Sequence, residues 1–409
     1  MTDQPRTRHA LAFIFVTVLL DSIGFGLVMP VFPQLIMSLT GRDVGGAAII
    51  SGWLGLGFAG MQFIFGPVIG GLSDRFGRRP VLLASLAAFG LDYIAMAFAP
   101  TIAWLFAARL VAGITGASFG TAYAYIADVS PPEKRAANFG ITGMAFGLGF
   151  IFGPVAGGLL SHYGTQVPFL AAAGLALLNV AYGWFVLPES LAPKNRRAFD
   201  WRRANPVGSL MRLKRYKPAV LTLATATFVW VVGFQALPVT WSYFTIARFG
   251  WTANQIGYSF AAVGLLAVVM QGGVGRLIIP RLGERRVIIM GACSAVAAYL
   301  IYAFAFEGWQ LYVGIAAGGM SGLVYQSLQA LMSREVSADE QGELQGSVSS
   351  IYAVAAIIGP VLMTQALAMF TRGVAGIVLP GAPYLLAAIL SAVALMVVVR
   401  SPHPAQTQQ

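Results

Sequence analysis

The sequence predicts an all-α integral membrane protein with twelve transmembrane helices, arranged as two six-helix halves in parallel repeat. The chain is 57% hydrophobic and only 10% charged, and its mean hydropathy is +0.75, whereas soluble globular proteins carry about a quarter charged residues. Twelve apolar segments approach or exceed the length of about 20 residues that a membrane-spanning helix needs. Short sequence signals in the first half recur at a fixed spacing in the second half.

Charged, proline-rich or glycine-rich breaks separate the predicted spans. Their length excludes an outer-membrane barrel, whose strands are about ten residues long. The first span follows Arg6 and Arg8 and has an acid in its middle, so we expect a retained helix and not a cleaved signal peptide. The predicted spans are Ala10–Ser38, Gly46–Gly71, Val81–Ala99, Ile102–Ala127, Phe139–Leu160, Pro168–Leu187, Ala219–Ile246, Gln255–Ile279, Val287–Phe306, Gln310–Met332, Ser347–Thr371 and Gly381–Val399.

The basic residues predict the orientation of the chain. Of the 26 Lys and Arg residues, 22 fall at the termini or in loops on one side of the predicted spans. The other side holds Arg42, Arg248 and Arg372, and Arg109 lies inside a span. Because Lys and Arg accumulate in cytoplasmic loops, we expect both termini to lie in the cytoplasm.

The longest polar stretch divides the helices six and six. It covers residues 188–218 and is strongly basic, so it is expected to be a cytoplasmic linker that contacts anionic lipid headgroups rather than nucleic acid. The predicted domains are an N-terminal six-helix bundle over residues 1–187 and a C-terminal bundle with a short cytoplasmic tail over residues 219–409.

The two halves share short glycine and proline signals at equivalent positions. Gly153-Pro154 recurs as Gly359-Pro360, and Gly77 recurs as Gly283, each pair 206 residues apart. A parallel repeat of two helical bundles is typical of transporters in which the substrate binds near the membrane midplane.

Three ionisable residues lie inside predicted spans: Asp21, Asp92 and Arg109. Charged groups in the bilayer are costly and mark functional sites. With a rise of 1.5 Å per residue, each of the three falls about 17–19 Å from the cytoplasmic surface. All three side chains can therefore meet at one depth.

One arginine cannot neutralise two carboxylates. If Arg109 pairs with one acid, the other acid is left desolvated and can load and release a proton, as a proton-coupled transporter requires. The alternative is a static buried ion pair that holds the helices in register, with the second acid reaching water in a cavity. Proton coupling is the favoured interpretation, because the two acids lie on separate helices of one half.

A second charged cluster lies between the second and third predicted spans, at residues 70–80. Asp74 can cap a helix N-terminus, and the arginines can bridge to acids such as Asp128, which would latch the cytoplasmic side shut. The arginines alone also fit a simple positive-inside topology signal. The residues of this predicted gate are Gly70, Asp74, Arg75, Gly77, Arg78, Arg79 and Asp128.

Small residues and a proline share the fifth predicted span: Gly149, Gly153, Pro154 and Gly157. Small residues allow close approach of a neighbouring helix, and proline kinks its own helix. The pattern favours helix packing, and a gating or leak-sealing hinge is the alternative.

Amides and aromatic residues inside the spans are candidates for the wall of a substrate cavity. Such a wall suits a flat, amphipathic organic compound, although each residue taken alone also fits helix packing. The candidates are Gln62, Phe119, Tyr123, Asn138, Phe146, Trp230, Phe234, Gln235, Gln271, Tyr325 and Gln326.

Other chemistries have little support in the sequence. One cysteine and three scattered histidines offer neither a disulfide framework nor a metal-ligand cluster, and no nucleophile–base pair indicates an enzyme. We expect no cofactor, with a proton gradient as the energy source. The expected partners are a small-molecule substrate, protons and the lipid bilayer, with no nucleic acid, and the expected functional unit is a monomer.

Several segments together resemble the major facilitator superfamily and, within its drug/proton antiporters, the tetracycline/proton antiporters. The segments that carry the superfamily and antiporter likeness are Leu20–Pro33, Gly70–Pro80, Leu91–Tyr93, Arg109–Gly113 and Gly149–Gly158. Those that resemble the tetracycline-efflux branch are Gly113–Ala117, Tyr125–Asp128, Leu187–Ser190, Leu282–Arg286 and Leu344–Gly346.

The resemblance implies proton-coupled export of tetracycline or other drugs across a bacterial inner membrane. It implies that Asp21, Asp92 and Arg109 are required for coupling, and that Arg78 with its acidic partners forms a cytoplasmic lock. If the substrate is tetracycline, a magnesium ion can accompany it.

The chain departs at three places from the tetracycline/proton antiporters that it resembles. Ala267 and Ala295 stand where those exporters carry a histidine and an aspartate, and Gln326 stands where they have a proline. An exporter of an endogenous metabolite or lipid-like compound on the same fold is therefore the alternative expectation.

Overall fold

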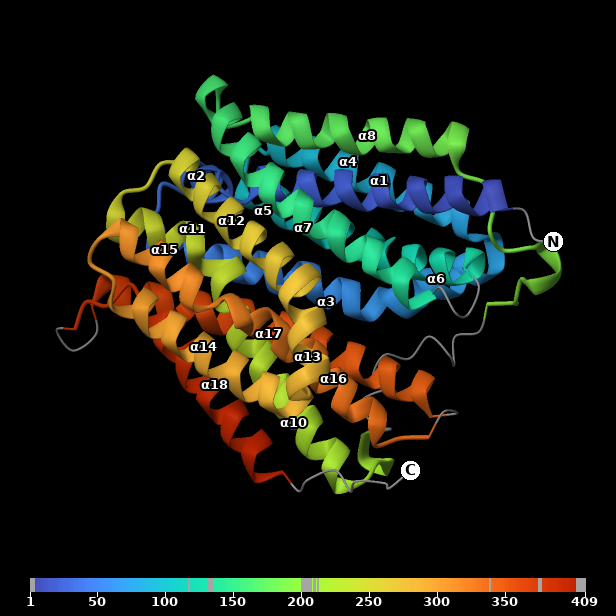
Figure 1. Ribbon diagram of the computed structural model, residues 1–409. Coiled ribbons are helices and arrows are strands. Elements are labelled where there is room, and N and C mark those ends of the chain that lie inside the picture. Colours follow the sequence, from blue (N-terminus) through green and yellow to red (C-terminus); the bar gives the residue numbers. More distant parts are fainter. Residues whose placement is uncertain are drawn as a thin grey trace. The chain divides into compact units, whose positions relative to one another are not determined.

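The computed structural model describes residues 4–116, 118–130, 135–199, 208, 211, 213–337, 340–373 and 377–401. The regular elements over these ranges are helices (Figure 1).

The chain forms two compact units. Unit 1 contains Met1–Gly41, Gly57–Asn205 and Trp251–Leu265, and unit 2 contains Arg42–Leu56, Pro206–Gly250 and Leu266–Gln409. Two long helical segments, one in each half of the sequence, therefore contribute to both units.

Unit 1 contains most of the first six predicted spans and the start of the eighth. Its helices are α1 (Gln4–Val28), α2 (Phe32–Thr40), the second part of α3 (Val44–Phe76), α4 (Arg78–Ala97), α5 (Ile102–Thr115), α6 (Ser118–Val129), α7 (Arg135–Leu160), α8 (Val167–Val186) and the first part of α12 (Ala253–Ala267). Two 3₁₀ turns follow α7 and α8, at Ser161–Tyr163 and Pro193–Asn195.

In unit 1, α1 packs along α7 and α8, and α4 packs along α8 (Figure 1). A buried apolar cluster that includes Phe13, Ile14, Tyr125 and Ile126 fills the contact of α1 with α6. Close packing of these side chains gives van der Waals contact between the two helices. The arrangement places the middle of α1, which carries Asp21, beside α7 and α8.

Unit 2 repeats this plan with more interruptions. Its helices are α10 (Pro218–Phe234), α11 (Ala236–Phe249), the end of α12, the π-helix η5 (Val268–Val274), α13 (Gly275–Leu282), α14 (Glu284–Phe304), α15 (Gly308–Ala317), the 3₁₀ helix η6 (Gly319–Leu323), α16 (Val324–Arg334), α17 (Gln341–Arg372) and α18 (Ala382–Arg400), with the first part of α3 and a 3₁₀ turn at Leu213–Arg215. Its core contains edge-to-face aromatic contacts, such as Trp241 with Tyr302 and Tyr384.

Ten helical segments among the described residues are long and apolar enough to span a membrane, and α1 with α2 adds an eleventh if this pair, bent by 45°, counts as one span. The tenth predicted span, Gln310–Met332, lies in α15, η6 and α16, none of which reaches 18 residues. Gly318, Gly319 and Gly322 fall at this interruption. The chain is thus a multi-pass helical membrane protein, while the count of twelve and the cytoplasmic termini stay predictions.

Candidate functional site

The buried charges of unit 1 form one ion pair. Arg109 of α5 pairs with Asp92 of α4, and the side chains are 17% and 3% exposed. The Arg109 guanidinium also lies 5.6 Å from the centroid of the Phe58 ring, a favourable cation–π distance. Of the two predicted acids, Asp92 is therefore the partner of Arg109.

Asp21 on α1 has a different environment. Among the described residues it forms no ion pair, and the amide of Asn179 on α8 lies beside its carboxyl group. Tyr93 is also close, since a Cβ atom placed on Gly24 would lie 3.5 Å from the Tyr93 hydroxyl oxygen. A carboxyl group with a neutral hydrogen-bond partner and no counter-ion is suited to gain and lose a proton.

Asn179 is fully buried and joins α8 to α1. Its Nδ2 donates to the Thr17 backbone carbonyl at 3.3 Å, and the Thr17 hydroxyl donates to Asn179 Oδ1 at 3.2 Å. Thr17 lies one helical turn before Asp21. Sequence reasoning missed Asn179, and the available signal was a single amide within the otherwise apolar α8 segment, which in a membrane helix indicates an interhelical bond.

The small residues of α7 bring it against the segment of α1 that follows Asp21. A Cβ atom on Gly153 would lie 2.6 Å from the Ile23 carbonyl oxygen, and one on Gly149 or Gly157 would overlap Ser22 or Leu27. Pro154 packs on α1 at Gly26 in the same contact. The spacing of four residues therefore serves close helix packing, and a hinge at Pro154 stays a prediction.

The predicted gate is mostly helical, because α3 continues to Phe76 and α4 begins at Arg78. Arg78 Nη1 lies 2.6 Å from Asp74 Oδ1, and Arg78 Nε donates to Asp128 Oδ2 at 3.2 Å. Arg78 therefore connects α3, α4 and α6, and the structure brings Asp74, Arg78 and Asp128 together.

Glu189, rather than Asp74, caps the N-terminus of α4. Its carboxylate accepts the backbone N–H groups of Arg78 and Arg79 at 2.9 and 3.3 Å, where the helix dipole favours a negative charge. Gly77 has φ +107°, and a Cβ atom there would overlap Glu189, so this position requires glycine.

The residues around Glu189 are tied to the same cluster. Ser190 Oγ donates to Asp128 Oδ2 at 3.1 Å, and the Tyr125 hydroxyl donates to the Pro188 carbonyl at 3.0 Å. The Leu187–Ser190 segment thus fastens the start of the linker to the charged cluster of Arg78.

The remaining residues of the predicted gate lie elsewhere. Arg79 donates to the Trp184 carbonyl at 2.5 Å and lies over its ring, and Arg75 lies 5.0 Å from the Phe76 ring centroid. Within the described part of the structure, Asp128 is held by Arg78 and Ser190 and not by Arg75 or Arg79. Gly70 lies within α3 with open space around a Cβ atom.

The cavity candidates of unit 1 are partly accessible. Gln62 of α3 donates to the Gly116 carbonyl at 2.8 Å, where α5 ends. Tyr123 and Phe146 are 46% and 44% exposed. The side chains of two further candidates fall outside the described part of the structure: Phe119 and Asn138.

The candidates of unit 2 divide between core and surface. Trp230 is buried at 2% exposure, and Gln235 packs on Gly359. The Tyr325 ring lies 5.7 Å from that of Tyr352, and Gln326 is exposed and bonded to another amide.

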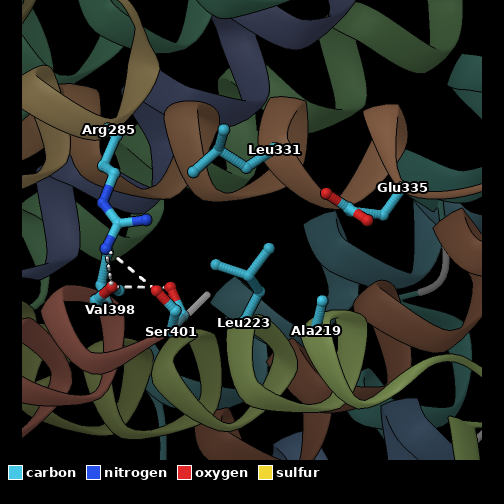
Figure 2. A pocket seen from close by; sticks show the side chains of 7 residues that line it. All are labelled: Ala219, Leu223, Arg285, Leu331, Glu335, Val398 and Ser401. Carbon is cyan, nitrogen blue, oxygen red and sulfur yellow. Dashed lines mark hydrogen bonds between the residues drawn. The ribbon is translucent and has the colours of Figure 1, made fainter. Parts of the chain in front are cut away.

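Figure 2 shows a small pocket at one end of unit 2. Its volume is about 20 Å³, room for little more than one water molecule, and far below the about 300–1,000 Å³ of drug-sized sites. Arg285 donates there to the backbone carbonyls of Val398, Val399 and Ser401 at 2.9–3.1 Å and so caps α18. The other lining residues are Ala219, Leu223, Leu331 and Glu335. This pocket belongs to a helix end and is no candidate for the substrate.

Comparison with known proteins gives a consistent result. The Major Facilitator Superfamily profile matches residues 14–360. The chain is 42% identical to a class C tetracycline resistance protein of Escherichia coli over 88% of this chain and 90% of that one. It is 36% identical to the class B protein of Escherichia coli over 85% and 86%.

Solved structures show the same fold. The crystal structure of the human organic anion transporter TETRAN is 25% identical, covers 97% of this chain and 100% of its own, and superposes with a TM-score of 0.73. The nucleoside transporter NupG shares 13% identity, covers 96% and 100%, and has a TM-score of 0.78. The helical fold, the profile match and the relatives together establish that the chain is a transporter and not an enzyme, and that it belongs to the Major Facilitator Superfamily.

Proposed function

We propose that this protein exports a small amphipathic organic compound in exchange for protons, by alternating access, across the bacterial inner membrane. The observation that carries the proposal is the difference in environment between two acids of unit 1. Arg109 neutralises Asp92, whereas Asp21 has an amide partner and no ion pair among the described residues. One carboxyl group is thereby left for proton transfer.

In this mechanism Asp21 binds the proton, and Asn179 and Thr17 hold its helix in place. The Asp92–Arg109 pair stays ionised and fixes α4 to α5. Protonation removes a charge from α1 and so changes the relative stability of two conformations, which is the requirement for any coupled population shift. Substrate binds when the proton leaves.

Tetracycline is the first substrate to test, and the relatives' names support this choice. If it is the substrate, it would carry its own magnesium ion, and the protein would supply no metal ligand. The monomer is the proposed functional unit.

The experiment is dequenching of a pH-sensitive dye in acidified everted membrane vesicles after addition of tetracycline with magnesium. The native chain should release protons, and the Asp21→Asn variant should not, with equal protein in the membrane. Asp43→Asn serves as a matched control, because Asp43 is a carboxylate in an exposed ion pair with Arg372.

Full proton release by the Asp21→Asn variant would rule out Asp21 as the coupling residue. No response of the native chain to tetracycline would move the assay to a panel of other drugs and metabolites.

Export of an endogenous metabolite or lipid-like compound is the second candidate. Ala295 is buried at 1% exposure, so an ionisable side chain like that of the resembling exporters has no accessible place there. Metabolite export without any drug phenotype would favour this candidate.

A further inference from the structure

Two interrupted helices pack together in unit 2. The π-helix η5 interrupts the eighth predicted span, and the 3₁₀ helix η6 interrupts the tenth. They are in contact, since a Cβ atom on Gly319 would lie 3.0 Å from Met270 Cε, and one on Gly322 would lie 3.0 Å from Gln271 Nε2. The missing side chain at Gly322 leaves the space that the Gln271 amide occupies. Interrupted helices of this kind often form binding sites in transporters.

An amide–amide hydrogen bond joins η5 to the start of α16, three residues after η6 ends. Gln326 Nε2 donates to Gln271 Oε1 at 3.0 Å. This bond leaves two N–H groups on Gln271, and one N–H group and the carbonyl oxygen on Gln326. No other hydrogen bond of these two side chains is recorded among the described residues. The pair therefore keeps both donors and acceptors for a ligand.

The two glutamines are exposed on unit 2, within segments predicted to span the membrane. Gln271, Gly272, Gly273 and Gln326 are all exposed in the structure, and a Cβ atom on either glycine would meet nothing within 4 Å. Irregular backbone and free amides at membrane depth are tolerated only within protein or against a water-filled cavity. This face of unit 2 is therefore unsuited to lipid and suited to water or a substrate.

Unit 1 uses its own glutamine differently. Gln62 of α3 donates to the Gly116 carbonyl, the backbone group left at the end of α5. That contact satisfies a backbone acceptor within the fold. In unit 2 the corresponding region bonds two side chains to each other instead, with hydrogen-bonding capacity left over.

We propose that Gln271 and Gln326 form a subsite for the neutral, hydrogen-bonding edge of a flat organic substrate, such as a keto–enol or amide edge. The proposal rests on the proposed export function and names the substrate chemistry of this part of the site. Neither η5 nor η6 contains an ionisable residue, so recognition there is by hydrogen bonds and not by charge.

The test uses the purified full-length protein and three variants: Gln271→Met, Gln326→Met and the double variant. Methionine keeps the length of the side chain and removes its hydrogen bonds. The probes are tetracycline with magnesium and a hydroxyanthraquinone, which have keto–enol edges, and tetraphenylphosphonium, which has no hydrogen-bonding group. Affinity is measured by calorimetry. Each single variant should weaken binding of the first two probes about tenfold, the equivalent of one or two lost hydrogen bonds, and leave tetraphenylphosphonium binding as in the native chain.

Probe affinity separates recognition from bracing, and melting temperatures check that the variants are folded. If the glutamines only brace η5 against α16, the double variant should bind all probes normally. It should also be as stable as the native chain, because replacing both partners by apolar groups can be nearly neutral. Gln365→Met on α17 is the matched control and should change neither binding nor stability.

Two results would overturn the subsite: unchanged affinity for both keto–enol probes in the double variant, or no binding of either probe by the native chain. A different measurement tests the export proposal. Failure of that proposal would appear as proton release by the Asp21→Asn variant, which leaves both glutamines in place.

Discussion

The repeat places an ion pair at the same two positions of each unit, with the charges exchanged. In unit 1, Arg78 at the start of α4 pairs with Asp128 of α6. In unit 2, Glu284 at the start of α14 pairs with Arg334 of α16. Each partner lies 206 residues after its counterpart. The duplicated fold thus preserves a bridge between these helices, and it does not preserve which helix carries the positive charge.

The units differ more deeply inside the bundle. The same offset carries the three buried charges of unit 1 to positions that are buried and uncharged in unit 2. Asp21, Asp92 and Arg109 correspond to Thr227, Ala298 and Ile315, which are 0%, 3% and 6% exposed. At these three positions unit 1 carries charges and unit 2 does not, and unit 2 presents amides at two interrupted helices instead. The comparison points to proton binding in one unit and recognition of uncharged groups in the other.

The largest expected effect comes from breaking the ion pair of unit 1. Arg109→Leu leaves Asp92 buried without its partner, and removal of one partner of a buried ion pair costs about 3–5 kcal/mol. Folded protein should fall sharply in fluorescence-detected size-exclusion chromatography. The double variant D92L/R109L, which copies the apolar character of unit 2, should recover folding without recovering proton-coupled export. A fully folded R109L protein would show that the pair contributes little.

The Asn179→Leu variant should have a smaller effect that is specific to coupling. It removes the amide that links α8 to Thr17 and Asp21, so the carboxylate loses a hydrogen-bond donor. We expect the proton dependence of export to move to higher pH, measured as rate against pH in vesicles.

Thr227→Val is the control from unit 2, because the Thr227 hydroxyl donates only to the Leu223 carbonyl of its own helix. Its pH profile should match that of the native chain. An Asn179→Leu variant with lower activity at every pH and an unmoved profile would assign Asn179 a purely structural role.

Exchanging the charges of unit 2 gives a direct test of the repeated bridge. Glu284→Arg alone places like charges together at the start of α14 and should lower stability by about 1 kcal/mol, or about 2–4 °C in melting temperature. The E284R/R334D double variant reproduces the charge order of unit 1 and should regain most of that loss. No recovery would mean that the sign of each charge matters in its own unit.

The smallest effect is expected at the exposed ion pair of unit 2. Asp43 accepts hydrogen bonds from Arg372 at 2.6 Å and from the Gly46 backbone at 2.9 Å, and these contacts hold the pKa of the Asp43 carboxyl below its usual value. A lowered folded-state pKa adds stability above the unfolded pKa of about 3.9, and that stability is lost as the pH falls through the folded value. Asp43→Asn should therefore melt slightly below the native chain at pH 7, and the two should melt together only at pH values below the lowered folded-state pKa of Asp43. A gap that persists in acid would contradict this assignment.

Hydropathy was sufficient to predict most of the helices. The third predicted span, Val81–Ala99, corresponds to α4 at Arg78–Ala97, because a continuous apolar run has no stable alternative to a helix in lipid. The break at η6 was not predicted. Gly318 and Gly319 lie in an apolar segment, and they do not lower its average hydropathy enough to mark a break. The π-helix η5 leaves no mark in composition, because it depends on how the chain accommodates one added residue against its neighbours.

The candidate site was only partly predictable. The depths of Asp21, Asp92 and Arg109 in their predicted spans identified these three residues. The depths did not show which acid pairs with Arg109, because the pairing depends on how α4 and α5 approach each other. Glu189 was known only as part of a family-like segment. Its role as the cap of α4 required knowing that the linker folds back onto Gly77. Asn179 could not be separated from ordinary helix packing without seeing its bond to Thr17.

The interruption at η6 also bears on how the chain enters the membrane during synthesis. α15 has 10 residues and α16 has 11, each about half of what a segment needs to cross the bilayer by itself. α14, in contrast, is 21 residues long with a mean hydropathy of 2.1, and it packs on α15, η6 and α16. We therefore expect the tenth segment to depend on α14 for insertion, as the second helix of a hairpin. Substitutions on the apolar surface of α14 would then remove Gln326 from the membrane without touching it.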